Sequence, residues 1–120
     1  MKILLVDDSG LARRRVRQML ESDGYEVIEA EDGMVALERY FVDKPDLVLL
    51  DLVMHGMYGL EVLTKLRQLD PAARVVVVSA DVQDSSKQMA HAAGAHAFLI
   101  KPVEREAVLA TVRGVLAEAG

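Results

Sequence analysis

Acidic, hydroxyl and amine side chains stand at the ends of four short apolar runs, and these residue types suit magnesium-dependent phosphoryl chemistry. Asp7 and Asp8 follow the first run, Asp51 ends another, Ser79 a third, and Lys101 follows the last. If these runs are parallel strands of one sheet, their carboxyl ends share one edge, which is where such sheets bind ligands. The sequence therefore predicts that these five side chains converge in one site.

Asp51 is the candidate phosphoryl acceptor, because aspartate is an established nucleophile that forms a covalent acyl phosphate. Phosphoryl transfer depends mainly on positioning and on neutralising charge on the transferring oxygens. Three carboxylates gathered at one point repel one another, and at about 5 Å and an effective dielectric of roughly 20 each pair costs on the order of 3 kcal/mol. A cation is therefore expected among them. Mg2+ prefers such oxygen ligands, and Mn2+ is the alternative ion.

The segments that must position these residues alternate between apolar and amphipathic character. Five apolar runs are predicted to be strands, at residues 2–6, 25–30, 46–51, 74–80 and 96–100. The first run, KILLV, is too short for a helix and too uniformly apolar for a strand with one face in water. It is expected to be a buried central strand, whereas the second run alternates more and is expected nearer an edge.

The segments between the predicted strands carry apolar residues at helical spacing. Ser9 and Asp32 are predicted N-caps of the first two helices, and Gly24 and Gly94 are predicted stops. Later helices are expected before Pro71, around residues 86–93 and over 104–118. In the second helix, Leu37, Tyr40 and Phe41 are expected to face inward. The apolar residues at helical spacing are Leu11, Ala12, Val16, Met19, Leu20, Leu37, Tyr40, Phe41, Leu60, Leu63, Leu66, Met89, Val108, Val112, Val115 and Leu116. The helix over 86–93 offers its inner face only Met89 and small alanines, and is expected to be weakly held.

The alternation predicts an α/β fold, a (βα)5 doubly wound parallel sheet of five strands with helices on both faces. A chain of 120 residues suits one domain, and we expect residues 1–120 to form it. The chain has no cysteine, no charged leader before an apolar segment and no apolar stretch near the roughly twenty residues of a membrane helix. A cytoplasmic protein without membrane contact is expected.

Net charge is -5, so a nucleic-acid surface would have to be local. The candidates are Arg13, Arg14, Arg15 and Arg17, and we interpret them as a solvated helix face. No direct nucleic-acid binding is expected. The histidines lack metal-ligand spacing and are interpreted as solvent-facing: His55, His91 and His96.

Four motifs together resemble the receiver domain of two-component response regulators, in particular its chemotaxis-regulator-like members. They are VDDS at 6–9, LLDLVM at 49–54, VSA at 78–80 and FLIKP at 98–102. The resemblance covers essentially the whole chain. It implies a flavodoxin-like sheet with the strand order 2-1-3-4-5.

The resemblance also implies a ligand set for Mg2+. Asp8 and Asp51 would bind the ion directly, Asp7 through water, and the backbone carbonyl of Val53 would supply a further oxygen. Lys101 would pair with one phosphoryl oxygen.

Two residues would then carry the conformational response. Ser79 would donate its hydroxyl to another phosphoryl oxygen, and Phe98 would be the aromatic switch that turns inward afterwards.

The implied function is a phosphorelay switch. A histidine kinase would donate a phosphoryl group to Asp51, and the face of the fourth helix, fifth strand and fifth helix would change to control a downstream protein or a fused output domain. A phosphorylation-dependent homodimer is a further expected partner state. The domain would phosphorylate and dephosphorylate itself without turning over an independent substrate.

Three alternatives remain. A haloacid-dehalogenase-type phosphatase also uses an aspartate at a strand end, but needs an acid two positions later, where Val53 stands. A flavin-binding domain needs a phosphate loop of glycine and hydroxyl residues, whereas Asp7 and Asp8 would repel a phosphate. A degenerate receiver that acts only as a binding module is disfavoured because every expected site residue is present.

Overall fold

Five strands and five helices alternate along the chain in a computed structural model that describes residues 1–54, 58–80 and 83–118. The strands are β1 (Lys2–Val6), β2 (Glu26–Ala30), β3 (Leu47–Asp51), β4 (Val75–Ser79) and β5 (Ala97–Ile100). The helices are α1 (Gly10–Ser22), α2 (Gly33–Asp43), α3 (Gly59–Leu69), α4 (Asp84–Ala92) and α5 (Arg105–Ala117). All five predicted strands and all five predicted helices are confirmed, with ends displaced by at most two residues.

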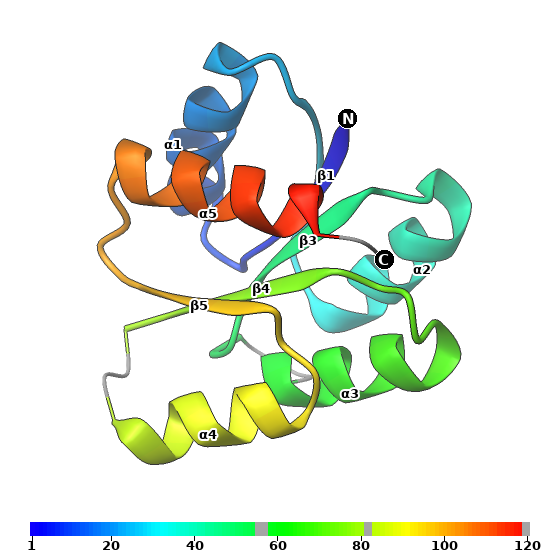
Figure 1. Cartoon of the computed structure of the whole chain (residues 1–120). Helices are drawn as coiled ribbons and strands as arrows, with labels where there is room; N and C mark the ends of the chain where they lie inside the picture. The colour runs from blue at the N-terminus through cyan, green and yellow to red at the C-terminus, as the bar shows by residue number, and fades with distance from the viewer. Residues whose placement is uncertain (55–57, 81–82, 119–120) are drawn as a thin grey trace.

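The strands form one parallel sheet in the order β2-β1-β3-β4-β5, as expected (Figure 1). The register aligns Val6 with Leu50, and Asp51 with Val78. The carboxyl ends of β1, β3 and β4 therefore lie side by side. We call the edge formed by the carboxyl ends of the strands the carboxyl edge.

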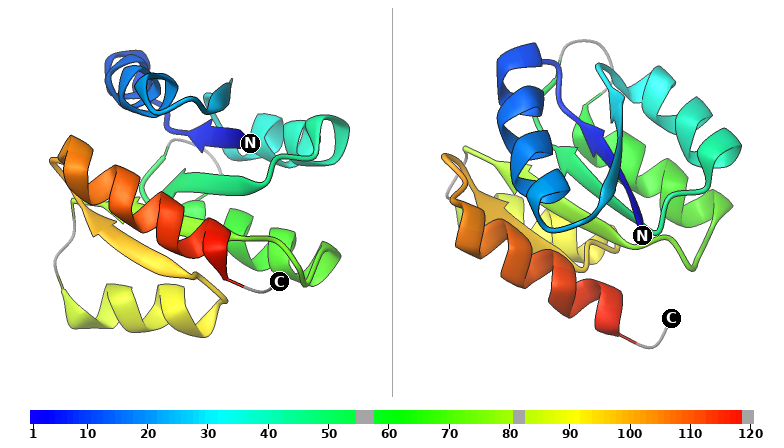
Figure 2. Two further views of the ribbon diagram at one scale, coloured as in Figure 1. Left: turned by 45° about the horizontal axis from the view of Figure 1, so that its top comes forward. Right: turned by 90° about the horizontal axis from the view of Figure 1, so that it is seen from above.

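Helices cover both faces of the sheet: α1 and α5 lie on one face, and α2, α3 and α4 on the other (Figures 1 and 2). Alternate residues of the central strands enter two separate cores. Ile3 and Leu5 of β1 pack on the side of α1 and α5, whereas Leu4 and Val6 pack on the opposite side. Burial on both faces explains why these strands are continuous apolar runs.

The predicted helix caps are present. The Ser9 hydroxyl accepts a hydrogen bond from the Ala12 amide, and the Asp32 carboxylate accepts one from the Val35 amide. Gly24 and Gly94 follow α1 and α4 with positive φ angles of 89° and 105°, a conformation that glycine adopts without the strain of a side chain.

Three apolar helix residues are solvent-exposed, contrary to the expected inner faces: Leu11, Phe41 and Met89. Phe41 lies one position beyond the buried Tyr40, about 100° around the helix, so its ring packs edge-on against Tyr40 instead of entering the core. Ala90 is the residue that α4 buries, which leaves the adjacent Met89 in solvent. The small inner face of α4 is as predicted.

The arginine cluster and the histidines also differ from expectation. Arg14 is exposed, but Arg13 and Arg17 are partly buried and paired with Glu29 on β2. His91 is exposed as predicted, whereas His96 is partly buried. His55 lies outside the described residues. None of the described helices combines the length and apolar character that crossing a membrane requires.

Candidate functional site

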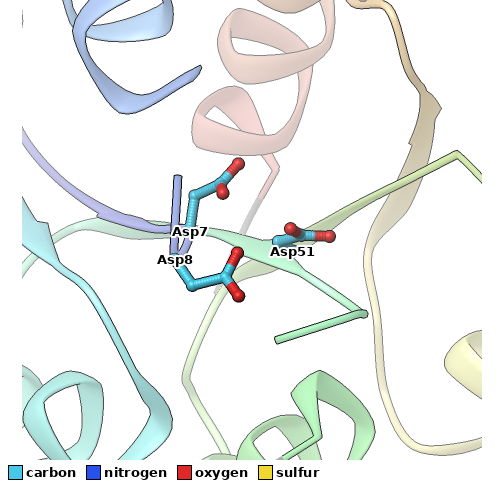
Figure 3. Close-up of side chains that lie close together, drawn as sticks. All are labelled: Asp7, Asp8 and Asp51. Atoms are coloured by element: carbon cyan, nitrogen blue, oxygen red, sulfur yellow. The ribbon is translucent and has the colours of Figure 1, made fainter. Parts of the chain in front are cut away.

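Three carboxylates meet at the carboxyl edge because β1 and β3 are neighbours. Asp7 and Asp8 come directly after β1, and Asp51 is the last residue of β3 (Figure 3). Each can contribute one oxygen so that the three atoms lie within 4.8 Å of one another. Asp7 and Asp51 are buried, and Asp8 is nearer to solvent. The predicted convergence of the acids is therefore present.

Lys101 supplies the positive charge at this site. Its Nζ donates to Asp7 Oδ2 at 3.0 Å and to Asp51 Oδ2 at 3.1 Å. The Lys101 amide donates to the Ser79 carbonyl at 2.8 Å, which ties the residue to the end of β4. The peptide bond between Lys101 and Pro102 is cis. Among the described residues, three carboxylates thus face the single ammonium group of Lys101, which leaves an excess of negative charge at the site.

The electrostatic environment shifts the pKa of both Asp51 and Lys101. Burial raises the pKa of Asp51 above its ordinary value, and the Lys101 hydrogen bond only partly offsets this effect. Burial would lower the pKa of Lys101, but its hydrogen bonds to Asp7 and Asp51 outweigh burial and leave that pKa raised. Lys101 therefore stays protonated at neutral pH, while the Asp51 carboxylate is held in a site that disfavours its charge.

The donor set fits a hard divalent cation. Among the residues that the structure describes, it consists of carboxylate oxygens from Asp7, Asp8 and Asp51, which are ligands that Mg2+ and Mn2+ accept. The excess negative charge also favours a cation. The Val53 amide donates to Asp51 Oδ1 at 3.2 Å, which places the Val53 backbone beside the acceptor, although its side chain points into solvent.

Two cavities flank the end of β3. One, of about 330 Å3, lies between α1, α5 and the sheet, and Asp7, Asp51 and Lys101 contribute to its wall. The other, of about 360 Å3, lies beside α3 and α4, and its wall includes Val53 and Ser79. Ser79 is fully buried at the end of β4, and it lines the second cavity, whereas Asp7 and Asp51 line the first.

Phe98 lies within β5, half-buried against the core on the side of α2, α3 and α4. The Lys87 ammonium lies 6.0 Å from the centre of its ring, at the outer limit of a cation–π contact. The predicted switch aromatic is thus already partly inward and is contacted from α4.

The family model of the response regulator receiver domain matches residues 3–113. The chain belongs to the response regulator receiver family. Among curated proteins, the receiver domain is 38% identical over 116 residues to the chemotaxis protein CheY of Bacillus subtilis, covering 96% of this chain and 97% of that protein. It is also 38% identical over 120 residues to the protein PilH of Pseudomonas aeruginosa, covering 97% and 98% of the two chains.

Solved structures of other receiver domains are also similar to this receiver domain. A CheY-like receiver domain of Methanospirillum hungatei superimposes with a TM-score of 0.91 at 30% identity, covering 96% of this chain and 92% of that one. The CheX-CheY-BeF3-Mg2+ complex of Borrelia burgdorferi contains a chain with a TM-score of 0.93 at 31% identity, covering 98% and 90%. The flavodoxin-like fold and its strand order are confirmed.

Gly59, at the start of α3, is a residue whose role in this receiver domain the sequence did not indicate. A Cβ atom at this position would collide with the Asp51 carbonyl oxygen and lie 2.6 Å from Leu52 Cα. Its amide donates to the Leu52 carbonyl at 2.9 Å. The first turn of α3 therefore packs directly on the backbone that carries the candidate acceptor. A glycine at a helix start is common, so only the close approach reveals this constraint.

Proposed function

We propose that this receiver domain accepts a phosphoryl group from a histidine kinase on Asp51 in a magnesium-dependent reaction. The observation that carries the proposal is the meeting of Asp51 with Asp7, Asp8 and Lys101 at one edge of the sheet. An Asp51 carboxylate oxygen would form the new bond to phosphorus as the bond from phosphorus to the donor nitrogen breaks. Positioning and charge neutralisation are the main requirements of such a transfer, and the site offers both.

Asp8 and Asp51 would hold Mg2+ or Mn2+ directly, with Asp7 through water and the Val53 carbonyl as a further oxygen. When bound, the cation would neutralise negative charge on the phosphoryl oxygens. The Lys101 ammonium would move from its carboxylate partners to a phosphoryl oxygen, and Ser79 would donate its hydroxyl to another. Magnesium is supported by the similar Borrelia burgdorferi CheY, which was solved in a complex with CheX, BeF3 and Mg2+.

The output of the switch would be the face made by α4, β5 and α5. Phe98 belongs to this face, and α4 buries only Ala90 among its described side chains. An element with so little buried apolar area has low local stability, so a coupling free energy of about 1–3 kcal/mol would suffice to move it. A downstream protein, a fused output domain or a phosphorylation-dependent homodimer would recognise the changed face.

We further propose that residues 1–120 act as one receiver domain in the cytoplasm, without direct contact to nucleic acid or membrane. The domain would gain and lose the phosphoryl group at Asp51 itself, with no independent substrate. A haloacid-dehalogenase-type phosphatase is disfavoured by Val53, which stands where that chemistry needs an acid.

Intact mass after incubation with acetyl phosphate and Mg2+ tests the proposal. The wild type is expected to gain the mass of one phosphoryl group, and Asp51→Asn is expected to gain none. Lack of a gain in the wild type would favour a degenerate receiver that acts only as a binding module. An equal gain in Asp51→Asn would assign the acceptor to another residue.

A further inference from the structure

The guanidinium of Arg13 connects the candidate metal site to the neighbouring strand. Arg13 lies in the first turns of α1, and its Nη1 group donates to the Asp7 carbonyl at 2.6 Å. Its Nε group donates to Glu29 on β2 at 3.0 Å. Only 17% of the Arg13 side chain is exposed. This arginine is therefore held between two acceptors and does not belong to a solvated helix face.

Glu29 is itself fixed on both oxygens. Its Oε1 accepts from Arg13, and its Oε2 accepts from Arg17 Nη1 at 2.6 Å. Burial would raise the pKa of Glu29, but the hydrogen bonds from Arg17 and Arg13 outweigh burial and lower that pKa overall. Glu29 is therefore ionised at neutral pH and orients the Arg13 fork toward Asp7.

Asp7 has a partner at each of its polar groups. Its amide donates to the Ala30 carbonyl at 3.2 Å, its Oδ1 accepts from the Ser9 amide at 2.9 Å, and its Oδ2 accepts from Lys101. Its carbonyl accepts from Arg13. This carbonyl belongs to the peptide unit that joins Asp7 to Asp8. The orientation of that peptide plane constrains the directions in which the side chains of Asp7 and Asp8 leave the backbone.

We propose that Arg13, oriented by Glu29, is a positioning residue for the metal site. By holding the peptide between Asp7 and Asp8, it keeps both carboxylates directed toward Asp51. The inference rests on the proposed function, since it concerns the affinity of the same site for Mg2+. Arg13 touches neither the cation nor the phosphoryl group in this scheme.

The sign of the effect separates positioning from simple electrostatics. A guanidinium near a cation site repels the cation, so loss of its charge alone would tighten Mg2+ binding. Loss of a positioning hydrogen bond would weaken binding, because the carboxylates would sample orientations that do not bind the ion. Residues that orient metal ligands commonly change metal affinity by about 10- to 100-fold when replaced.

Isothermal titration calorimetry with Mg2+ alone tests the proposal on the full chain. Arg13→Gln is expected to raise the dissociation constant for Mg2+ about 10-fold. Arg14→Gln is the matched control, because it removes the same charge from the adjacent, exposed position. It is expected to leave affinity unchanged or slightly tighter. Melting temperatures without metal are measured in parallel, because a purely structural role would lower them without weakening Mg2+ binding.

Two further variants test the route through Glu29 and guard against misfolding. Arg13→Gln combined with Glu29→Gln is expected to bind no more weakly than the weaker single variant, because the two residues act as one unit. Arg13→Lys keeps the charge and one donor group, so it is expected to fold and to bind with intermediate affinity.

The outcomes distinguish this inference from the proposed function. If the wild type binds Mg2+ and both Arg13→Gln and Arg13→Lys bind it equally well or more tightly, the positioning role is overturned and the proposed function stands. If the wild type itself gives no Mg2+ binding at millimolar concentration, both the positioning role of Arg13 and the metal requirement of the proposed function are overturned.

Discussion

Lys101 and Asp51 are 50 positions apart in the chain, yet Lys101 Nζ lies 3.1 Å from Asp51 Oδ2. The same ammonium lies 3.0 Å from Asp7 Oδ2. Lys101 therefore bridges the carboxylates of two neighbouring strands. Because a bound divalent ion would perform part of this neutralisation, the proposed function has the lysine move to another anionic group when the site fills.

Replacing Lys101 by methionine should destabilise the metal-free protein and enlarge its response to Mg2+. The variant leaves Asp7 and Asp51 facing each other without the ammonium, and loss of hydrogen bonds between charged groups costs about 1–3 kcal/mol. Melting temperatures with and without Mg2+ measure both effects. Lys65→Met, on the exposed face of α3, is the control and should change neither value appreciably. Equal behaviour of the two variants would contradict the bridging role.

Replacing Gly59 by alanine should disturb the acceptor strand. The added Cβ would meet backbone atoms of Asp51 and Leu52, which cannot turn aside as a side chain can. We expect a loss of about 1–3 kcal/mol in the free energy of unfolding and slower phosphorylation by acetyl phosphate. Urea unfolding and intact mass over time measure these two quantities.

Gly114→Ala in α5 is the matched control for Gly59→Ala. Apart from the neighbouring backbone of α5, no atom of the described residues lies within 4 Å of a Cβ built at Gly114, so alanine should raise stability there by about 0.5–1 kcal/mol through helix propensity. If alanine stabilised the protein at both positions, the backbone at the end of β3 would be shown to move aside for the added Cβ at little cost.

The fold was predictable because burial on two faces leaves a strong pattern in the sequence. Runs such as that of β3 are uniformly apolar and end abruptly at charged residues, so both the strand and its functional end could be located. The parallel topology then required Asp7, Asp8 and Asp51 to share an edge. Their convergence also requires that β1 and β3 are neighbours, and the strand order implied by the family resemblance supplied this adjacency.

Contacts that depend on side-chain reach or on backbone carbonyls were not predictable. The Arg13 bond to the Asp7 carbonyl and the packing of Gly59 on Asp51 leave no periodic pattern in the sequence. Phe41 and Met89 were wrongly placed inside, because one position along a helix rotates a side chain by about 100° and the apolar residue next to the buried one looks equivalent. His96 was wrongly placed in solvent, because its partner is a backbone amide of another strand.

His96 should make the stability of the protein depend on pH. Its Nδ1 accepts a hydrogen bond from the Val75 amide at 3.3 Å, which requires that this nitrogen is unprotonated. Burial, followed by the charge of Arg67, lowers the pKa of His96 from its ordinary value of 6.5. The unfolded chain then binds a proton more readily than the folded one, so folding stability should fall as pH drops through 6.5 toward the lowered value.

Urea unfolding of His96→Asn and of the exposed control His91→Asn, above and below pH 6.5, measures the histidine effect. The wild type and His91→Asn should lose stability in parallel on acidification, whereas His96→Asn should lose less. A parallel loss in all three proteins would contradict the assignment to His96.

Replacing Asp51 by asparagine should stabilise the metal-free protein at neutral pH, although it removes the proposed acceptor. Burial raises the pKa of Asp51 above 3.8, so the folded protein binds this proton more readily than the unfolded chain. Ionisation of Asp51 therefore costs stability, and this cost appears as pH rises from 3.8 through the raised value and is complete above it. Subtracting the unfolding free energies of wild type from those of Asp51→Asn at a series of pH values removes titrations common to both. The difference should grow across that interval and then level off, and Mg2+ should shrink it by stabilising only the wild type. A difference that stays constant with pH would mean that the Asp51 carboxylate carries no penalty for its burial.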